Sequence, residues 1–277
     1  MKIKSLSDRV TLNNGISMPW MGLGVFKMIQ EKEATNSVLW ALEAGYRSID
    51  TASAYGNETD VGKAISESGV KREEIFLTTK VNNGEQRSKR TLNAFNESLD
   101  RLNQDYVDLY LIHWPVKEHY NETWKVLEKI YESGRAKSIG VSNFLVHQLK
   151  DLLSHTGIIP AVNQIEFHPY LIQPDLMKFC NDKGIRLEAW SPLMQGRILE
   201  IPLIKQLAEK YGKNPVQIVL RWDLQHEVIT IPKSVHKDRI ISNADIFDFE
   251  ISDEDMKLID KLDQNTRIGP DPDNFNF

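Results

Sequence analysis

Four side chains that can hold and move protons follow predicted strands of this chain. Asp50, Lys80 and His113 each end a predicted strand, and Tyr55 lies in a loop five residues past Asp50. An α/β barrel holds its reactive groups at the carboxyl ends of its parallel strands. We therefore expect the acid, the phenol, the amine and the imidazole to lie together at one end of such a barrel.

The elements that must position these side chains alternate regularly along the chain. Eight segments predict strands: 20–24, 47–50, 75–80, 107–113, 138–142, 161–166, 186–190 and 228–232. Helical patterns fall between them: 32–44, 60–68, 89–102, 122–133, 145–155, 174–183, two helices within 202–226 and one after Asp238. Eight strand–helix units in roughly 230 residues predict an α/β fold, a closed (β/α)8 TIM barrel that forms one domain over residues 1–277.

Two segments lie outside the eight units. Residues 10–18 alternate apolar and polar side chains around Asn14-Gly15, a pattern that predicts a β-hairpin. We expect this hairpin to cap the bottom of the barrel. The tail 269–277 reads as a loop that folds over the mouth.

A dinucleotide-binding doubly wound domain is the obvious rival fold. Gly22-Leu23-Gly24 begins a G-x-G sequence, but Lys27 occupies the third glycine position and no helix opens directly after it. The fingerprint of that fold is therefore incomplete.

Composition excludes several classes of function. The net charge of −5 offers no basic surface for nucleic acid. No apolar run is long enough to span a bilayer, and no apolar core follows the first residues as a signal peptide would require. The single cysteine, Cys180, cannot form a disulfide within the chain and reads as a core thiol. We expect a cytoplasmic monomer without nucleic-acid or membrane partners, and the histidines and acids show no metal-ligand spacing.

Three motifs identify a family resemblance. They resemble the signatures of the aldo-keto reductases: 45–52 continuing through Glu58 and Gly62, then 139–144, and then 231–234 followed by Arg239 and Asn243. The likeness runs essentially from end to end. It is strongest to short prokaryotic members that reduce glyoxal and methylglyoxal, and the family fold is the barrel predicted above.

The resemblance implies a catalytic role for each of the four side chains. Tyr55 would be the general acid that protonates the carbonyl oxygen during reduction. Lys80, paired with Asp50, would lower the pKa of the phenol. His113, as a neutral donor, would orient the substrate oxygen. Taken singly, each residue is as easily a solvated strand end or a packing side chain, but four of them after strands of one barrel favour catalysis.

The resemblance also implies a site for NADPH. The cofactor-binding positions would be Gly24, Val25, Asp50, Ser142, Asn143, Gln164, Trp190, Ser191, Leu193, Gln195, Lys233, Ser234, Val235, Arg239 and Asn243. Trp190 stands where the family often has a tyrosine that stacks on the nicotinamide, and an indole keeps that flat face. The loop with Lys233 and Arg239 would, without the third motif, be interpreted as a solvated basic surface. With the motif, its positive charges favour binding of NADPH over NADH, because only NADPH carries a 2′-phosphate.

The substrate side is less defined. Phe26 and Trp114, with Trp20 as a further candidate, would form an apolar rim beside Tyr55 and His113. Such a rim suits small aldehydes and dicarbonyls. Reduction of sugars, keto-sugar acids or prostaglandin-type ketones fits the same four residues. A cofactor-binding sensor is the alternative of another class, although no catalytic position is replaced.

Overall fold

Eight parallel strands close into a barrel in the computed structural model, which describes residues 3–277. The strands are β3 (Leu23–Gly24), β4 (Ser48–Asp50), β5 (Phe76–Val81), β6 (Leu109–Ile112), β7 (Ile139–Ser142), β8 (Val162–Glu166), β9 (Arg186–Trp190) and β10 (Ile229–Thr230). Each strand pairs with the next in chain order. A parallel bridge between Met21 and Thr230 joins the two ends of the sheet, so the predicted (β/α)8 fold is confirmed.

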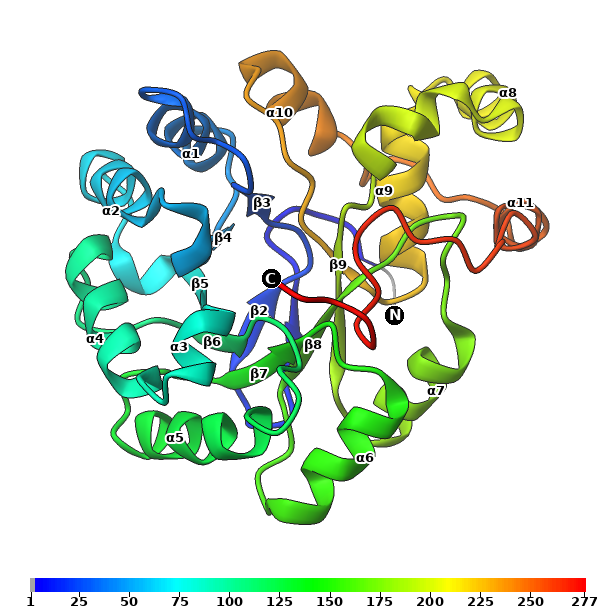
Figure 1. Ribbon diagram of the computed structural model, residues 1–277. Coiled ribbons are helices and arrows are strands. Elements are labelled where there is room, and N and C mark those ends of the chain that lie inside the picture. The colour runs from blue at the N-terminus through cyan, green and yellow to red at the C-terminus, as the bar shows by residue number, and fades with distance from the viewer. Residues whose placement is uncertain (1–2) are drawn as a thin grey trace.

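Helices form a ring around these strands (Figure 1). They are α1 (Glu33–Glu43), α2 (Glu58–Glu67), α3 (Asn83–Arg87), α4 (Thr91–Leu102), α5 (Tyr120–Glu132), α6 (Val146–His155), α7 (Pro174–Asp182), α8 (Pro202–Tyr211), α9 (Pro215–Gln225), α10 (Lys237–Asn243) and α11 (Asp253–Asp260). Most carry an apolar stripe that faces the sheet. α3 and α11 were not predicted, because five and eight residues give little periodicity to detect.

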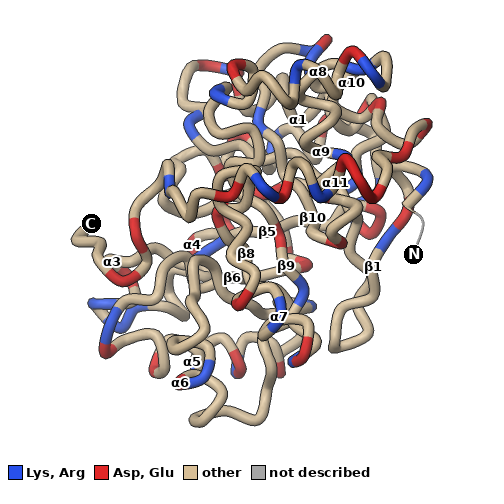
Figure 2. Tube along the Cα trace, turned by 90° about the vertical axis from the view of Figure 1, so that its right-hand side faces the viewer, with Lys and Arg blue, Asp and Glu red and all other residues tan. Residues whose placement is uncertain are grey.

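The amino-terminal hairpin covers the bottom of the barrel as predicted. Its strands β1 (Arg9–Thr11) and β2 (Ser17–Pro19) pair antiparallel. At its turn, Asn13 donates to the carbonyl of Pro160 and Asn14 donates to that of Lys137, residues that precede β8 and β7. In side view the hairpin and the carboxyl end of the chain lie on opposite sides of the molecule, and acidic and basic residues are interspersed along the trace (Figure 2).

The carboxyl-terminal tail crosses the mouth of the barrel (Figure 1). At one side, Glu166 at the end of β8 accepts hydrogen bonds from the backbone N–H groups of Ile268 and Gly269. At the other side, Asn83 and Arg87 of the α3 segment donate to the backbone oxygen of Phe277. The tail therefore folds over the mouth, as the sequence predicted, and is held from both edges.

The barrel strands are shorter than the apolar runs that predicted them. The runs 20–24 and 228–232 leave only β3 and β10, two residues each. Hydrogen bonds nevertheless continue past these strands, from Gly24 N–H to the carbonyl of Pro232 and from Gly22 N–H to that of Thr230. The seam thus closes through backbone that lacks a regular strand ladder.

Candidate active site

Lys80 is the centre of a buried polar network at the mouth of the barrel. Its ammonium group lies 2.7 and 2.8 Å from the carboxylate oxygens of Asp50 and 2.9 Å from the carbonyl oxygen of Thr51. Its Nζ is 3.4 Å from the hydroxyl oxygen of Tyr55. The side chain of Lys80 is fully buried and that of Asp50 is 3% exposed. An ammonium has three donors, so Asp50, Thr51 and Tyr55 use all of them.

The loop that carries Tyr55 is fixed by an asparagine. Asn57 is buried and its amide donates to the carbonyl oxygens of Val25 and Met28. Its side-chain oxygen accepts a hydrogen bond from the hydroxyl of Thr51. Asn57 therefore ties the loop after β4 to the loop after β3, which holds the phenol in place above Lys80.

The pKa of Tyr55 reflects opposing effects. Burial raises it, while the charge of Lys80 and the hydrogen bond from Lys80 lower it, and the net pKa lies above the ordinary value. Lys80 thus acts in the predicted direction, whereas the charge of Asp50 raises the pKa of the phenol and desolvation of the phenolate is the largest effect. The phenol stays protonated at neutral pH and can act as an acid.

His113 follows β6 and faces Tyr55. Their rings lie edge to face with centroids 5.6 Å apart. Burial, and then the positive charge of Lys80, lowers the pKa of His113 well below its ordinary value. The imidazole is therefore neutral at pH 7 and can donate a hydrogen bond through one ring nitrogen, as predicted.

Polar groups and an indole ring line the opposite side of the mouth. Asn143, with a left-handed φ of 66°, donates to the carbonyl of His113 and accepts a hydrogen bond from the indole N–H of Trp190. Ser142 donates to the carbonyl of Gln164. The tail passes against the indole ring, because a Cβ at Gly269 would come within 2.3 Å of Cη2. These contacts fix the indole of Trp190 beside the polar ends of β7 and β8.

The remaining cofactor positions surround this group. Gly24 pairs with Asp50 in register, and the N–H of Val25 donates to the carbonyl of Asp50. Ser191 and Gln195 have positive φ in an irregular loop after β9 that also contains Leu193. The last five positions lie in and just before α10. Ser234 and Asn243 are buried, and Val235 is half-buried. Lys233 and Arg239 are exposed.

The basic side chains of this last segment differ in their partners. Lys237 pairs with Glu43 at 2.7 Å. Within the described residues, Lys233 and Arg239 have neither an ion pair nor a side-chain hydrogen bond. Two exposed cations without a carboxylate partner fit the extra phosphate of NADPH. The donor set of the site is therefore consistent with that cofactor.

The aromatic rim is built partly by the tail. Phe26 is exposed and packs 4.9 Å from the ring of Tyr55. Trp114 is buried under Phe275 and Phe277, with ring centroids 5.2 and 5.3 Å away. The suggestion that Trp20 belongs to this rim is wrong. Trp20 is buried and lies against Arg186, the first residue of β9, so it belongs to the lower half of the barrel.

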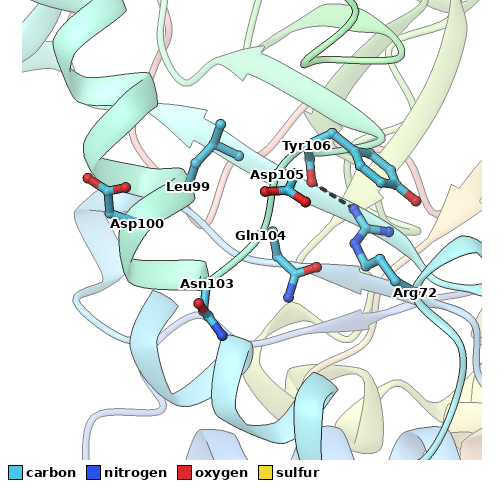
Figure 3. Close-up of a pocket in the computed structure, with 7 residues that line it drawn as sticks. All are labelled: Arg72, Leu99, Asp100, Asn103, Gln104, Asp105 and Tyr106. Atoms are coloured by element: carbon cyan, nitrogen blue, oxygen red, sulfur yellow. Dashed lines mark hydrogen bonds between the residues drawn. The ribbon is translucent and has the colours of Figure 1, made fainter.

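A hollow of about 530 Å³ lies far from these residues (Figure 3). It is lined by Arg72, Leu99, Asp100, Asn103, Gln104, Asp105 and Tyr106. Arg72 and Tyr106 precede β5 and β6, so the hollow opens at the amino ends of the strands. That end of a barrel serves stability rather than catalysis. Among residues 3–277, no cluster of His, Cys, Asp and Glu could hold a metal, and no helix is long and apolar enough to cross a membrane.

Comparison with known proteins shows the family of this chain. The model of the aldo/keto reductase family matches residues 20–264. The chain belongs to this oxidoreductase family. Glyoxal reductase of Bacillus subtilis (strain 168) is 57% identical over 99% of this chain and 99% of its own length. Methylglyoxal reductase DkgA of Escherichia coli (strain K12) is 47% identical over 96% and 97%.

A solved structure is also similar over the whole chain. A mutant of Gox0644, crystallised in complex with NADPH, superposes with a TM-score of 0.93, covers 100% of both chains and is 42% identical. This aldo/keto reductase therefore shares both fold and sequence with a protein that binds NADPH.

Three polar residues of this aldo/keto reductase were overlooked in the sequence. Asn57, Glu166 and Glu188 are all buried and all fix other parts of the mouth. Glu188 had a detectable signal, because an acid interrupts the buried strand 186–190. Asn57 and Glu166 gave no comparable signal, since the contacts by which they fix the mouth are made to backbone groups of distant loops.

Proposed function

We propose that this aldo/keto reductase catalyses the NADPH-dependent reduction of small aldehydes and ketones, with dicarbonyls such as glyoxal and methylglyoxal as substrates. The observation that carries the proposal is the 3.4 Å approach of Lys80 Nζ to the hydroxyl of Tyr55, beside a neutral His113. Two of the relatives, a glyoxal reductase and a methylglyoxal reductase, support the substrate class.

The cofactor would bind along the line from Trp190 to Arg239. When bound, NADPH would supply the hydride. Ser142, Asn143 and Gln164 would bind the carboxamide, and the indole of Trp190 would offer a flat apolar face to the ring. Lys233 and Arg239 would hold the 2′-phosphate, because their charges have no carboxylate to neutralise them within the described residues.

The chain itself would handle the proton. Lys80 donates to the phenol oxygen, so the hydroxyl hydrogen of Tyr55 is free to point toward a carbonyl oxygen at the mouth. His113 would donate a second hydrogen bond to the same oxygen. As the carbonyl oxygen gains negative charge, Tyr55 would release its proton, and Lys80 would stabilise the phenolate that remains. Asp50 keeps the buried ammonium compensated throughout.

The aromatic rim favours small substrates. Phe275 and Phe277 cover Trp114, so the tail occupies part of the apolar surface beside His113. Sugars, keto-sugar acids and prostaglandin-type ketones would have to displace or bypass these rings.

The test is NADPH oxidation by the purified protein with methylglyoxal, glyoxal and a bulky aromatic aldehyde. We expect the two dicarbonyls to be reduced faster than the aromatic aldehyde. Tyr55→Phe should lower the rate by roughly 10²- to 10⁴-fold, the range of general acid catalysis, with NADPH binding retained. Equal rates for Tyr55→Phe and the parent would refute the mechanism. Tight NADPH binding without turnover on any carbonyl would instead indicate the sensor.

A further inference from the structure

A second carboxyl group lies beneath the candidate catalytic residues. Glu188 is in the middle of β9, and its register neighbours are Gln164 on β8 and Ile229 on β10. Its side chain is fully buried. None of the proposed catalytic steps uses it, so its presence inside the barrel needs another explanation.

Gln164 joins this carboxyl group to Asp50. The amide nitrogen of Gln164 lies 2.8 Å from Oδ2 of Asp50 and 2.7 Å from Oε2 of Glu188. An amide NH2 has two hydrogens, and here each points to a different carboxyl group. The reverse orientation would place the amide oxygen against the carboxylate of Asp50, which can only accept hydrogen bonds, so Asp50 selects the nitrogen end of the amide and Glu188 accepts its second hydrogen. The oxygen of Gln164 is thereby left to accept a hydrogen bond from another group.

The charges around Glu188 do not balance if it is ionised. Asp50 already neutralises Lys80, and within the described residues Oε1 of Glu188 has no hydrogen-bond partner. A second buried carboxylate would be uncompensated, which is costly in a low-dielectric interior. Burial, and then the negative charge of Asp50, raises the pKa of Glu188 to about 8.

We propose that Glu188 is a positioning residue for the reductase reaction, which holds the amide of Gln164 in one orientation while neutral and weakens the proton donor Tyr55 when it ionises. This inference rests on the proposed function, because it assigns Glu188 a task relative to Tyr55 and the cofactor amide. The residue itself touches neither the substrate nor the reacting atoms.

Ionisation of Glu188 would act on two groups of the site. The charged or titratable groups that act on Glu188 are Asp50 from β4 and Lys80 from β5. In return, a negative charge on Glu188 raises the pKa of both Tyr55 and Lys80. A phenol with a higher pKa is a poorer acid. Carbonyl reduction should therefore fall as the pH rises through the ionisation of Glu188.

Two substitutions separate the charge from the hydrogen bond. Glu188→Gln keeps an acceptor for Gln164 but cannot ionise, so the fall in kcat/KM above about pH 8 should move to higher pH. Glu188→Met removes the acceptor as well, and should weaken NADPH binding about five- to tenfold, the value of one ordinary hydrogen bond. Asp223→Asn is the matched control, because Asp223 is another fully buried acid whose pKa burial raises, bonded to Thr230 and remote from Tyr55.

The ionisation can also be followed without turnover. In protein labelled with ¹³C at the glutamate carboxyl carbons, the resonance absent from Glu188→Gln should titrate with a midpoint near 8. A midpoint near the ordinary value of 4.5 would overturn the proposal. So would an unchanged pH profile in Glu188→Gln, or unchanged NADPH affinity in Glu188→Met. If the parent protein reduces no carbonyl, the proposed function fails, but the titration and the binding assay still decide whether Glu188 is neutral and holds Gln164.

Discussion

The two ends of this barrel each hold an acid paired with a cation, and the pairs do different things. At the mouth, Lys80 and Asp50 are 0% and 3% exposed. At the bottom, Arg72 and Asp108 are 18% and 17% exposed and lie 2.8 Å apart. Asp50 and Lys80 lie on the neighbouring strands β4 and β5, whereas Arg72 and Asp108 lie in the segments that lead into the neighbouring strands β5 and β6. An ion pair between neighbouring β/α units therefore does not by itself mark a catalytic pair.

The difference lies in where the remaining donors point. Arg72 donates to the carbonyl oxygens of Ile75 and Tyr106, and Asp108 accepts from the N–H of Leu77. All of these partners are backbone groups, so the pair ties together the segments that enter β5 and β6. Lys80 instead directs one donor at the phenol of Tyr55. Arg72 also lies over the ring of Tyr106, 4.1 Å from its centroid, but directs no hydrogen-bond donor at the hydroxyl of that residue. A donor aimed at the hydroxyl itself, as at Tyr55, can stabilise the phenolate that proton transfer leaves.

Lys80→Met should give the largest effect. Carbonyl reduction near neutral pH should fall by at least about 10³-fold, because the phenolate left by proton transfer would lose its stabilising charge. Asp50 would also be left buried without its cation, with only the amide of Gln164 as a partner, which should cost about 3–5 kcal/mol of unfolding free energy. Turnover and chemical denaturation of the same variant measure both losses. The affinity for NADPH should stay unchanged. If carbonyl reduction by Lys80→Met kept the pH dependence of the parent, Lys80 would have no part in the mechanism.

Arg72→Met tests the other end of the barrel. It should lower the unfolding free energy by about 2 kcal/mol, since several hydrogen bonds to a charged group are lost at a partly exposed site. Turnover per folded molecule should stay within about twofold, because Arg72 contacts no residue at the mouth and distant sites act independently. A large loss of turnover in fully folded Arg72→Met would break the contrast between the two ends.

Arg239→Ala tests a cation with no protein partner within the described residues. We expect no measurable change in stability, because the side chain is exposed and makes no ion pair there. The preference for NADPH over NADH should fall about tenfold, equivalent to the ~1.4 kcal/mol expected of one charge-assisted hydrogen bond. Affinities for the two cofactors measure this ratio. Lys237→Ala is the control, because Lys237 is already neutralised by Glu43.

The stability of the protein should also depend on pH through Glu188. Its pKa is raised from 4.5 in the unfolded chain to about 8 in the fold. Over that interval the folded state holds a proton that the unfolded state has lost, so stability falls as the pH rises. The melting temperature of Glu188→Gln should therefore exceed that of the parent by an amount that grows from pH 5 toward pH 8. A difference that shrinks over this range would contradict the raised pKa.

The sequence by itself determined the barrel and the strand ends that carry Asp50, Lys80 and His113. It could do so because strand–helix alternation and turn signals are local, and because the carboxyl ends of parallel strands meet at one end of the sheet. The hairpin around Asn14-Gly15 was predictable for the same reason, as its turn depends on only two residues.

Only the tertiary structure decided which polar groups meet across the mouth. Gln164 meets Asp50 although 114 residues separate them, and the tail reaches Glu166 and α3 from opposite sides. The net rise in the pKa of Tyr55 and the displacement of Trp20 to the lower barrel likewise depend on burial. Desolvation and long-range contacts are properties of the packed interior, where every neighbour contributes, and no local pattern in the chain encodes them.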